Sequence, residues 1–414
     1  MVETMEIQKG FKQTEVGVIP SDWKVPIIDE ISEVKSGKRL PLGKSLTDRE
    51  TSHPYIRVVD MFMGGVSLND IKYVPDDVYP SIKHYCIFID DIFISVAGSL
   101  GIVGKIPYKL DGANLTENAD RLTNISCNRD YLLYVLMSWL IQNKIEAEKT
   151  LGAQPKLALT RIRKFFLPLP PTKTEQTAIA TALNDADALI TQLGKLIAKK
   201  QAIKQGAMQE LLKPKAGWEV KKLSNCLKQN PDYGINAAAV AFNESLPVYL
   251  RITDITEDGK HSKKNVVSVD NINSSYYFLE KADLVFARTG ASVGKTYLYN
   301  TKDGELIFAG FLIRVKVNPE VLLPEYFQFY TQTYSYWNWI RSNSTRTGQP
   351  GINGNEYIKL PINMPVTIEE QTRIAQILSD MDAEIEALEK KLDKYKMIKQ
   401  GMMQNLLTGR IRLV

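Results

Sequence analysis

Cysteine is scarce in this sequence of 414 residues, which contains only three. Cys86, Cys127 and Cys226 are odd in number and far apart, which argues against a disulfide framework and against a zinc site of paired cysteines. Long apolar runs are missing as well, since the nearest candidate, YCIFIDDIFISVAG, is interrupted by Asp90 and Asp91. Because the first residues, MVETMEIQKG, lack the apolar core of a secretory signal, we predict a cytoplasmic protein that does not enter a membrane.

The familiar patterns of catalytic sites are also missing. His53, His84 and His261 have no partners at metal-ligand spacing. The stretch TGASVGKT, which begins at Thr289, looks like a phosphate-binding loop, but it is one residue short between its first glycine and Gly-Lys-Thr. Neither an Asn-Pro-Pro-Tyr motif nor a Gly-x-Gly-x-x-Gly loop is present. We therefore expect this chain to catalyse nothing itself and to bind neither a metal nor a cofactor.

A large excess of charge of one sign is absent too. The formal net charge of +5 permits a nucleic-acid partner but does not require one. An apolar fraction of 44% and a charged fraction of 24% are typical of soluble globular proteins. The chain is too long for one ordinary core, so we expect about two to four compact units.

What the sequence does contain is a long internal repeat. IKQGAMQELL begins at residue 203 and IKQGMMQNLL at residue 398, so the two copies are 195 residues apart. Over the segments that begin EQTAIATALNDADALI and EQTRIAQILSDMDAEI, roughly half of about 40 aligned positions are identical. The same offset relates Trp23 to Trp218, so the repeated unit includes more than a helix.

The most similar part of the repeat has the heptad spacing of a long helix. The first copy of the apolar seam comprises Ile179, Leu183, Ile190, Leu193 and Ile197. The second copy comprises Ile374, Leu378, Met381, Ile385, Leu388, Leu392 and Tyr395. An ordinary core helix is the alternative for either copy alone, but two matched copies favour a pair of long helices packed on each other within the chain. Pairing between chains is the rival arrangement.

Local signals predict where these helices begin and end. Thr172 with Glu175, and Thr367 with Glu370, have the spacing of a capping box, in which each side chain would bond to the backbone of the other residue. Pro214 and Gly409 are expected to end the helices, which gives each about 40 residues and a length of roughly 60 Å.

The regions between the helices mix β-rich runs with helical stretches and diverge much more. YIRVVDM corresponds to YLRITDI, and DDIFISVAGSLGIVGK corresponds to ADLVFARTGASVGK, which aligns Lys105 with Lys295. We expect an α+β protein with two mixed α/β domains separated by two long antiparallel helices in a pseudo-twofold arrangement. The expected parts are residues 1–20, which complete the repeat together with the C-terminus, a first domain at 21–170, a central helix at 171–214, a second domain at 215–365 and a C-terminal helix at 366–414.

In this combination the sequence resembles the specificity subunit of a type I restriction-modification system, over nearly the whole chain. The resemblance is carried by TEVGVIPSDWKV near the start, by the two helices that begin with EQ, and by the loops TLGAQP and RTGQPG before them. It implies two target-recognition domains, each reading one half of a split and asymmetric DNA sequence, and helices that set the gap between the half-sites.

The resemblance also implies partners. These are double-stranded DNA, two methyltransferase subunits that bind the helices, and restriction subunits that join through the complex. S-adenosylmethionine, ATP and magnesium would be bound by those subunits and not by this chain.

DNA recognition needs cations for phosphates, and forked or amide side chains for base edges. In the first domain the candidates are Lys35, Lys38, Arg39, Arg57, Lys105, Gln154 and Lys156. In the second they are Arg251, Arg288, Lys295, Arg341, Arg346 and Gln349. A solvated surface charge or a structural role is the alternative for each. Because Arg57 and Arg251 share their placement, they suit phosphate contact or folding better than discrimination between sequences, and we expect base readout in the divergent loops.

Two other interpretations stay open at this point. One is a coiled-coil scaffold without a DNA role, and the other is an enzyme hidden in the globular domains. The aromatic stretch YSYWNWI, which begins at Tyr334, has helical spacing and predicts a helix packed in the core in preference to a platform for base stacking.

Overall fold

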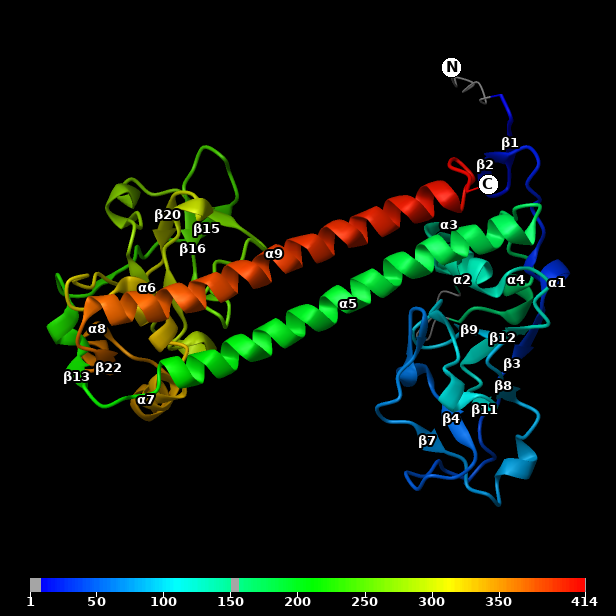
Figure 1. The fold of residues 1–414 in the computed structure, drawn as a ribbon, viewed down its shortest axis with the longest axis horizontal. Helices are drawn as coiled ribbons and strands as arrows, with labels where there is room; N and C mark the ends of the chain where they lie inside the picture. Colours follow the sequence, from blue (N-terminus) through cyan, green and yellow to red (C-terminus); the bar gives the residue numbers. More distant parts are fainter. Residues whose placement is uncertain (1–8, 150–155, 414) are drawn as a thin grey trace. The chain divides into compact units, whose positions relative to one another are not determined.

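The chain divides into two compact units in the computed structural model, which describes residues 9–149 and 156–413. Unit 1 comprises Met1–Gly194 and Lys391–Val414, and unit 2 comprises Lys195–Lys390. Each unit therefore contains one globular domain and part of each long helix, α5 (Lys173–Leu211) and α9 (Ile368–Leu406) (Figure 1). Helices and short strands are mixed in both domains, which gives an α+β fold. No described helix has an apolar stretch long enough to cross a membrane.

The domain of unit 1 is built from short strands followed by helices. Its strands are β1 (Phe11–Thr14), β2 (Gly17–Pro20), β3 (Glu33–Ser36), β4 (Pro54–Ile56), β5 (Met61–Phe62), β6 (Gly65–Val66), β7 (Lys72–Tyr73), β8 (Cys86–Ile87), β9 (Ile92–Ser95), β10 (Val103–Lys105), β11 (Ala113–Leu115) and β12 (Ala119–Thr123). Its α-helices are α1 (Ile28–Ile31), α2 (Arg129–Met137), α3 (Trp139–Glu148) and α4 (Leu159–Ile162).

The domain of unit 2 repeats this plan. Its strands are β13 (Trp218–Lys222), β14 (Asp232–Tyr233), β15 (Ala239–Ala241), β16 (Val248–Leu250), β17 (Val267–Val269), β18 (Leu284–Ala287), β19 (Thr296–Leu298), β20 (Leu306–Phe308), β21 (Leu312–Val315) and β22 (Pro361–Pro365). Its α-helices are α6 (Pro324–Tyr330), α7 (Tyr334–Ser344) and α8 (Gly354–Tyr357).

The antiparallel sheets of the two domains correspond strand by strand. An antiparallel sheet has the order β10-β9-β12-β3 in unit 1 and β19-β18-β21-β14 in unit 2. A second sheet has the order β7-β4-β11-β8 in unit 1 and β15-β17-β16-β20 in unit 2. Its parallel pairs, β4 with β11 and β16 with β20, make β7, β4 and β11 equivalent to β17, β16 and β20, whereas the edge strands β8 and β15 have no equivalent among the described strands of the other unit. The divergent sequences between the helices therefore encode the same central topology twice, with one edge strand different in each unit.

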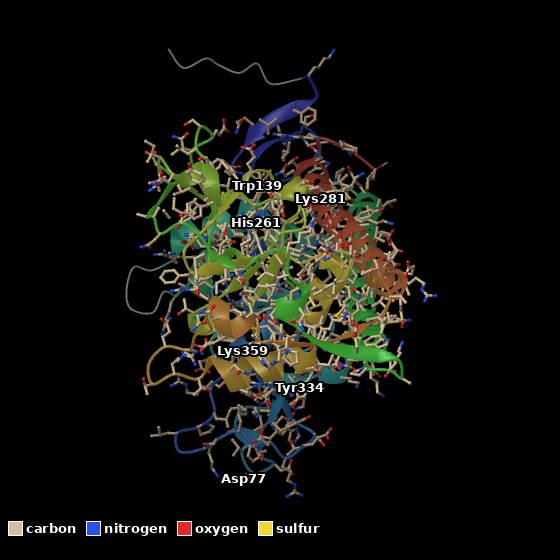
Figure 2. All side chains as sticks on the ribbon, turned by 90° about the vertical axis from the view of Figure 1, so that its left-hand side faces the viewer. Asp77, Trp139, His261, Lys281, Tyr334 and Lys359 are labelled. Atoms are coloured by element: carbon tan, nitrogen blue, oxygen red, sulfur yellow. The ribbon has the colours of Figure 1, made fainter. Side chains whose placement is uncertain are left out.

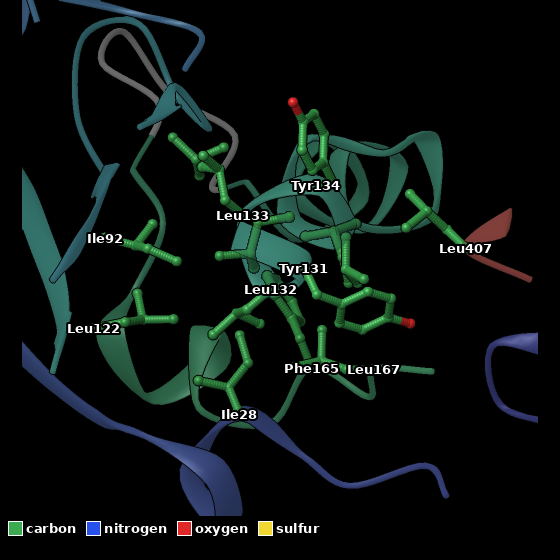
Figure 3. Packing of buried hydrophobic residues seen from close by; sticks show 14 of the residues in the cluster. Ile28, Ile92, Leu122, Tyr131, Leu132, Leu133, Tyr134, Phe165, Leu167 and Leu407 are labelled. Atoms are coloured by element: carbon green, nitrogen blue, oxygen red, sulfur yellow. The ribbon is translucent and has the colours of Figure 1, made fainter. Parts of the chain in front are cut away.

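The largest core of each unit joins its domain to the long helices. In unit 1, Tyr131 of α2 belongs to one buried cluster with Ile28, Leu122 and Leu407, so strands, domain helices and the residue that follows α9 share this core (Figure 3). In unit 2, Tyr326 of α6 belongs to the corresponding cluster with residues of α9. The Tyr131 hydroxyl donates to the carbonyl of Pro168 at 2.8 Å, and the Tyr326 hydroxyl donates to Asn363 at 3.0 Å, again 195 residues apart. This burial stabilises the start of each helix on its own domain.

The helix starts have only half of the predicted capping boxes. The amide of Glu175 donates to the Thr172 hydroxyl at 3.2 Å, and that of Glu370 donates to Thr367 at 3.3 Å, as expected. The glutamate carboxylates do not return to the backbone of these threonines. Both carboxylates are instead bound by side chains distant in sequence, so the prediction of reciprocal caps was wrong.

In unit 1 the partner of Glu175 comes from the C-terminal segment. The Arg412 guanidinium donates to both Glu175 oxygens at 2.6 and 2.7 Å and also binds Asp22 at 2.9 Å. In unit 2, Glu370 accepts a hydrogen bond from the indole of Trp218 at 3.1 Å. Arg412 therefore joins a segment near the start of the described chain to one near its end. At the equivalent place in unit 2, the chain runs on without a break from α5 into β13.

Candidate nucleic-acid interface

In unit 2 the loop that follows β18 meets the Gln-Pro loop, and in unit 1 the loop that follows β9 meets Lys156 and Leu157. In unit 2 the amide of Ile352 donates to the carbonyl of Arg288 at 2.9 Å, and Gly290 donates to Pro350 at 2.9 Å. In unit 1 the amide of Leu157 donates to the carbonyl of Val96 at 3.0 Å. We call this part of each domain the corner. Arg288 and Val96 occupy equivalent backbone places in it, but Arg288 is half-buried whereas Val96 is buried in the core of unit 1.

This backbone equivalence corrects the alignment of Lys105 with Lys295. Lys105 pairs with Ile92 across the sheet, and the equivalent pair in unit 2 is Leu298 with Leu284. Lys295 lies before its strand, where its backbone bonds to Ala287. The loop is one residue longer in unit 2, so the two Gly-Lys pairs in the sequence are not structural equivalents.

The two arginines with a shared placement are held inside their own domains. Arg57 donates to both carboxylate oxygens of Asp60 at 2.9 and 2.7 Å, and Arg251 makes the same two bonds to Asp254 at 2.9 and 2.8 Å. Both aspartates are buried, and hydrogen bonding to them raises the pKa of each arginine. Because these donors already have partners, a structural role accounts for both residues.

A second pair of common arginines was missed by the sequence interpretation. Arg121 lies 3.5 Å from the buried Asp91, and Arg314 lies 3.5 Å from the buried Asp283. Their positions in β12 and β21 are equivalent. The sequence does contain an arginine and an aspartate at equivalent places in both repeats. Loops of different length between them shift the two copies out of alignment, so the pairs are not seen at one fixed offset.

Most other candidates in the first domain also have partners. Lys35 pairs with Glu33, Arg39 with Glu117 and Lys105 with Asp130, at 2.7, 2.7 and 3.1 Å. Lys38 lies 5.6 Å from the ring centroid of Tyr85. Lys156 forms a bridge with Ala97 in the corner, and Gln154 lies outside the described residues.

In the second domain three candidates also have partners and two have no carboxylate among the described residues. Lys295 pairs with Glu257 at 2.6 Å, and Arg346 makes a two-pronged contact with Glu356 at 2.6 and 2.7 Å. Arg341 bonds to Asn338 and lies 5.6 Å from the ring centroid of Tyr334. Arg288 and Gln349 lie at the corner, and neither has a carboxylate partner among the described residues.

The aromatic stretch forms α7, which buries Tyr336 fully and leaves Tyr334 76% exposed. Tyr334 lies beside a surface cavity of about 400 Å³ that is also lined by Gln205 and Gln209 of α5. Figure 2 shows Tyr334 and Lys359 at one end of unit 2, with His261 toward the other. A single helix therefore contributes both to the core and to the surface next to α5.

The predicted helical seam is divided between domain cores and the helix pair. Ile179 and Leu183 belong to the core of unit 1, and Ile374 and Leu378 to that of unit 2. Buried outside these cores are Leu193, Ile197 and Ile385. Half-buried are Ile190, Met381, Leu388, Leu392 and Tyr395.

Two matched ion pairs show that α5 and α9 run antiparallel. In unit 1, Lys399 of α9 binds Asp187 of α5 at 2.6 Å, and in unit 2 Lys204 of α5 binds Asp382 of α9 at 2.6 Å. The aspartates are 195 residues apart, as are the lysines. Lys399 also lies 5.5 Å from the ring centroid of Tyr134, and Lys204 lies 5.4 Å from that of Phe329. Each lysine thus ties both helices to the adjacent domain.

Two glutamines attach the helix starts to their domains and were also missed. Gln176 accepts from the amide of Asn128 at 2.8 Å, and Gln371 accepts from that of Leu323 at 2.8 Å. Both are buried and identical at the offset of 195 residues.

The described residues offer little for metal or thiol chemistry. Among them, no group of three or more histidine, cysteine, aspartate or glutamate side chains is close enough to hold a metal. All three cysteines are free and buried, and burial raises the pKa of Cys127 and of Cys226 to about 11.

Comparison with known proteins finds relatives across the whole chain. A family model described as "Type I restriction modification DNA specificity domain" matches residues 20–205 and 215–396. The MjaX specificity subunit of Methanocaldococcus jannaschii, described as a type I restriction enzyme subunit, is 26% identical over 98% of this chain and 97% of its own length. The MjaVIII specificity subunit of the same organism is 23% identical over 100% of this chain and 99% of its own.

Solved structures share the fold. The S subunit of a type I restriction-modification system from M. genitalium has a TM-score of 0.57 and 16% identity, over 93% of this chain and 96% of that one. A chain from a study of complex assembly in a type I restriction-modification system has a TM-score of 0.55 and 15% identity, over 95% and 99%.

Proposed function

Because this chain belongs to the family of type I restriction-modification DNA specificity domains, we propose that it reads a split, asymmetric DNA sequence for a type I restriction-modification complex. Each unit would read one half-site through the corner of its domain. The observation that carries this proposal is the duplicated frame with divergent corners. The Arg–Asp pairs recur, whereas the corner has the half-buried Arg288 in one unit and a buried valine, Val96, in the other. One fold presented twice with different surface chemistry is suited to two different half-sites.

The partners follow from a second repeated feature. Identical residues at the offset of 195 recur on accessible parts of both helices, where folding does not require identity: Ile203, Gln205, Gly206 and Gln209 on α5, and Ile398, Gln400, Gly401 and Gln404 on α9. Two copies of one surface suit two copies of one partner. We assign this surface to two methyltransferase subunits, which would supply S-adenosylmethionine chemistry, and restriction subunits using ATP and magnesium would join through them. This chain would be non-catalytic and act in the cytoplasm.

The repeated glycines provide a test of that surface. A Cβ atom at Gly206 or Gly401 would meet nothing within 4 Å, so the fold does not need glycine at either position. Replacing both with alanine should stabilise the isolated chain by about 1–2 kcal/mol, because glycine costs roughly 0.5–1 kcal/mol in a helix. It should weaken methyltransferase binding, because a partner backbone would approach there. Denaturant unfolding and calorimetric titration measure the two effects.

Gly194→Ala is the matched control. Gly194 also lies on α5, where an added Cβ atom would meet nothing within 4 Å, but α9 has Glu389 at the equivalent position. This variant should gain stability without losing partner affinity. Equal affinity in all variants would remove the glycines from the proposed interface.

The proposed function itself is tested by reconstitution. The chain is combined with its cognate methyltransferase subunit and a random DNA library, and methylated adenines are mapped by sequencing. We expect one split motif that appears only when both proteins are present. Methylation that does not depend on this chain, or an assembled complex with no DNA affinity, would favour a scaffold without DNA recognition.

A further inference from the structure

The corner of unit 2 holds one arginine in a fixed backbone position. Arg288 follows β18, and its amide donates to the carbonyl of Phe311 at 3.0 Å. Its own carbonyl accepts from Ile352 at 2.9 Å. The main chain at Arg288 is therefore held from both sides, by the turn before β21 and by the Gln-Pro loop, so the side chain starts from a defined point on the surface.

The Arg288 guanidinium is half-buried but has no carboxylate among the described residues. Its Cζ atom lies 5.0 Å from the ring centroid of Tyr233. That ring is itself held, because the Tyr233 hydroxyl accepts a hydrogen bond from the amide of Gly354 at 3.0 Å. A guanidinium beside an aromatic face keeps its positive charge and its planar fork of donors. The Tyr233 ring thus orients the Arg288 side chain, and no carboxylate of the described residues pairs with its charge.

The neighbours of Arg288 include residue types that proteins use to contact DNA bases. Phe311 is 57% exposed, and Gln349 is also exposed. The Gln349 amide packs on the loop, since a Cβ at Gly290 would lie 2.7 Å from its Nε2 atom. Gly290 has a φ of +72°, so glycine is required there for the backbone as well as for space. The corner therefore presents a guanidinium, an amide and an aromatic ring together.

The first domain has different chemistry on the same backbone. Val96 occupies the place of Arg288, with its amide donating to Asn118 at 2.8 Å and its carbonyl accepting from Leu157, but its side chain is buried in the core of unit 1. The nearby Arg39 is bound to Glu117, the residue before Asn118, at 2.7 Å. The arginines that both domains share have carboxylate partners in both. Arg288 differs from all of these because it is present in only one domain and no carboxylate of the described residues pairs with it.

We infer that Arg288 is a specificity-determining residue that reads a guanine in the half-site of the second domain. Its two donors would bond to the O6 and N7 atoms of guanine in the major groove, the commonest specific contact of arginine with DNA. A phosphate contact would serve any sequence, so it would be useful in both domains and would not call for arginine in one and valine in the other. The inference rests on the proposed function and adds a residue and a base to it.

The test compares methylated motifs from complexes that contain Arg288→Ala or Arg288→Lys. For the wild-type complex we expect a split motif with guanine at one position of one half-site. Both variants should keep the other half-site and lose the preference for that guanine, with discrimination falling by about 5- to 100-fold. Lysine keeps the charge but lacks the fork, so partial recovery of DNA affinity without recovery of the base preference is expected for Arg288→Lys.

Lys359→Ala is the matched control, since it removes one exposed positive charge from the same domain outside the corner. It should leave the motif unchanged. Each variant is checked for wild-type unfolding temperature and for assembly with the methyltransferase subunit. If Arg288→Ala methylates the wild-type motif, at full rate or uniformly more slowly, Arg288 is a solvated or phosphate-binding residue and the inference is wrong. If the wild-type complex has no motif, the proposed function fails first and the inference falls with it.

Discussion

Removing seven residues from each long helix, 191–197 of α5 and 386–392 of α9, should shorten the gap in the methylated motif by about three base pairs. Seven helical residues span roughly 10 Å, and one base pair of B-DNA rises about 3.4 Å. One heptad is nearly two helical turns, so the apolar seam stays in phase. Sequencing of methylated DNA from the reconstituted complex gives the spacing directly. This outcome follows only if the helices set the distance between the recognition domains.

The ion pairs of the helices supply the design of this experiment and its control. The deletions fall between Asp187 and Lys204 on α5 and between Asp382 and Lys399 on α9, so both antiparallel pairs remain in step. A deletion in one helix alone puts the two pairs out of step and should lower stability and complex yield. If an intact double-deletion complex still methylates DNA with the wild-type spacing, the helices do not set the distance between the half-sites.

The second large effect is a loss of stability, and it is expected at one glycine in each domain. Gly37 follows β3 in unit 1, and Gly234 follows β14 in unit 2. A Cβ atom at Gly234 would lie 2.2 Å from the carbonyl oxygen of Ala309 and 2.3 Å from that of Phe308. At Gly37 the equivalent distances, to Thr116 and Leu115, are 2.0 and 2.4 Å. In both cases the clash is with backbone carbonyl oxygens, which cannot move away by a side-chain rotation. Gly234→Ala and Gly37→Ala should each destabilise the protein by about 3 kcal/mol or more, measured by denaturant unfolding.

Gly348→Ala is the control for these two substitutions. A Cβ at Gly348 would meet nothing within 4 Å, and the residue lies in an exposed loop. Its stability should change by no more than about 0.5 kcal/mol. If Gly234→Ala were equally mild, the close approach of the β14 end to the β20 end would not hold in solution.

Predictions that depend on local signals agreed with the structure. Heptad spacing, the two threonine caps and the stop signals at Pro214 and Gly409 predicted helices of about 40 residues, and α5 and α9 have 39 each. These features could be read from the sequence because a helix is determined by residues three or four positions apart. The repeat of 195 residues also predicted two similar domains, since similar sequences adopt similar folds.

Predictions that depend on partners distant in sequence were less accurate. Glu175 and Glu370 were expected to close capping boxes, but Arg412 and Trp218 bind them. Lys105 and Lys295 were expected to correspond, but a loop longer by one residue places Leu298 opposite the strand in place of Lys295. Neither outcome can be read from spacing, because it depends on which segments the fold brings together.

The sequence by itself therefore determined the family, the duplicated plan and the two long helices, all of which rest on repeated local patterns. Only the tertiary structure decided which cations are available at the surface. Arg57 and Arg251 are chemically equal to Arg288, yet buried aspartates bind both of them, whereas Arg288 meets the face of Tyr233. Charge pairing depends on distances of a few ångströms between residues far apart in the chain, and those distances exist only once the chain has folded.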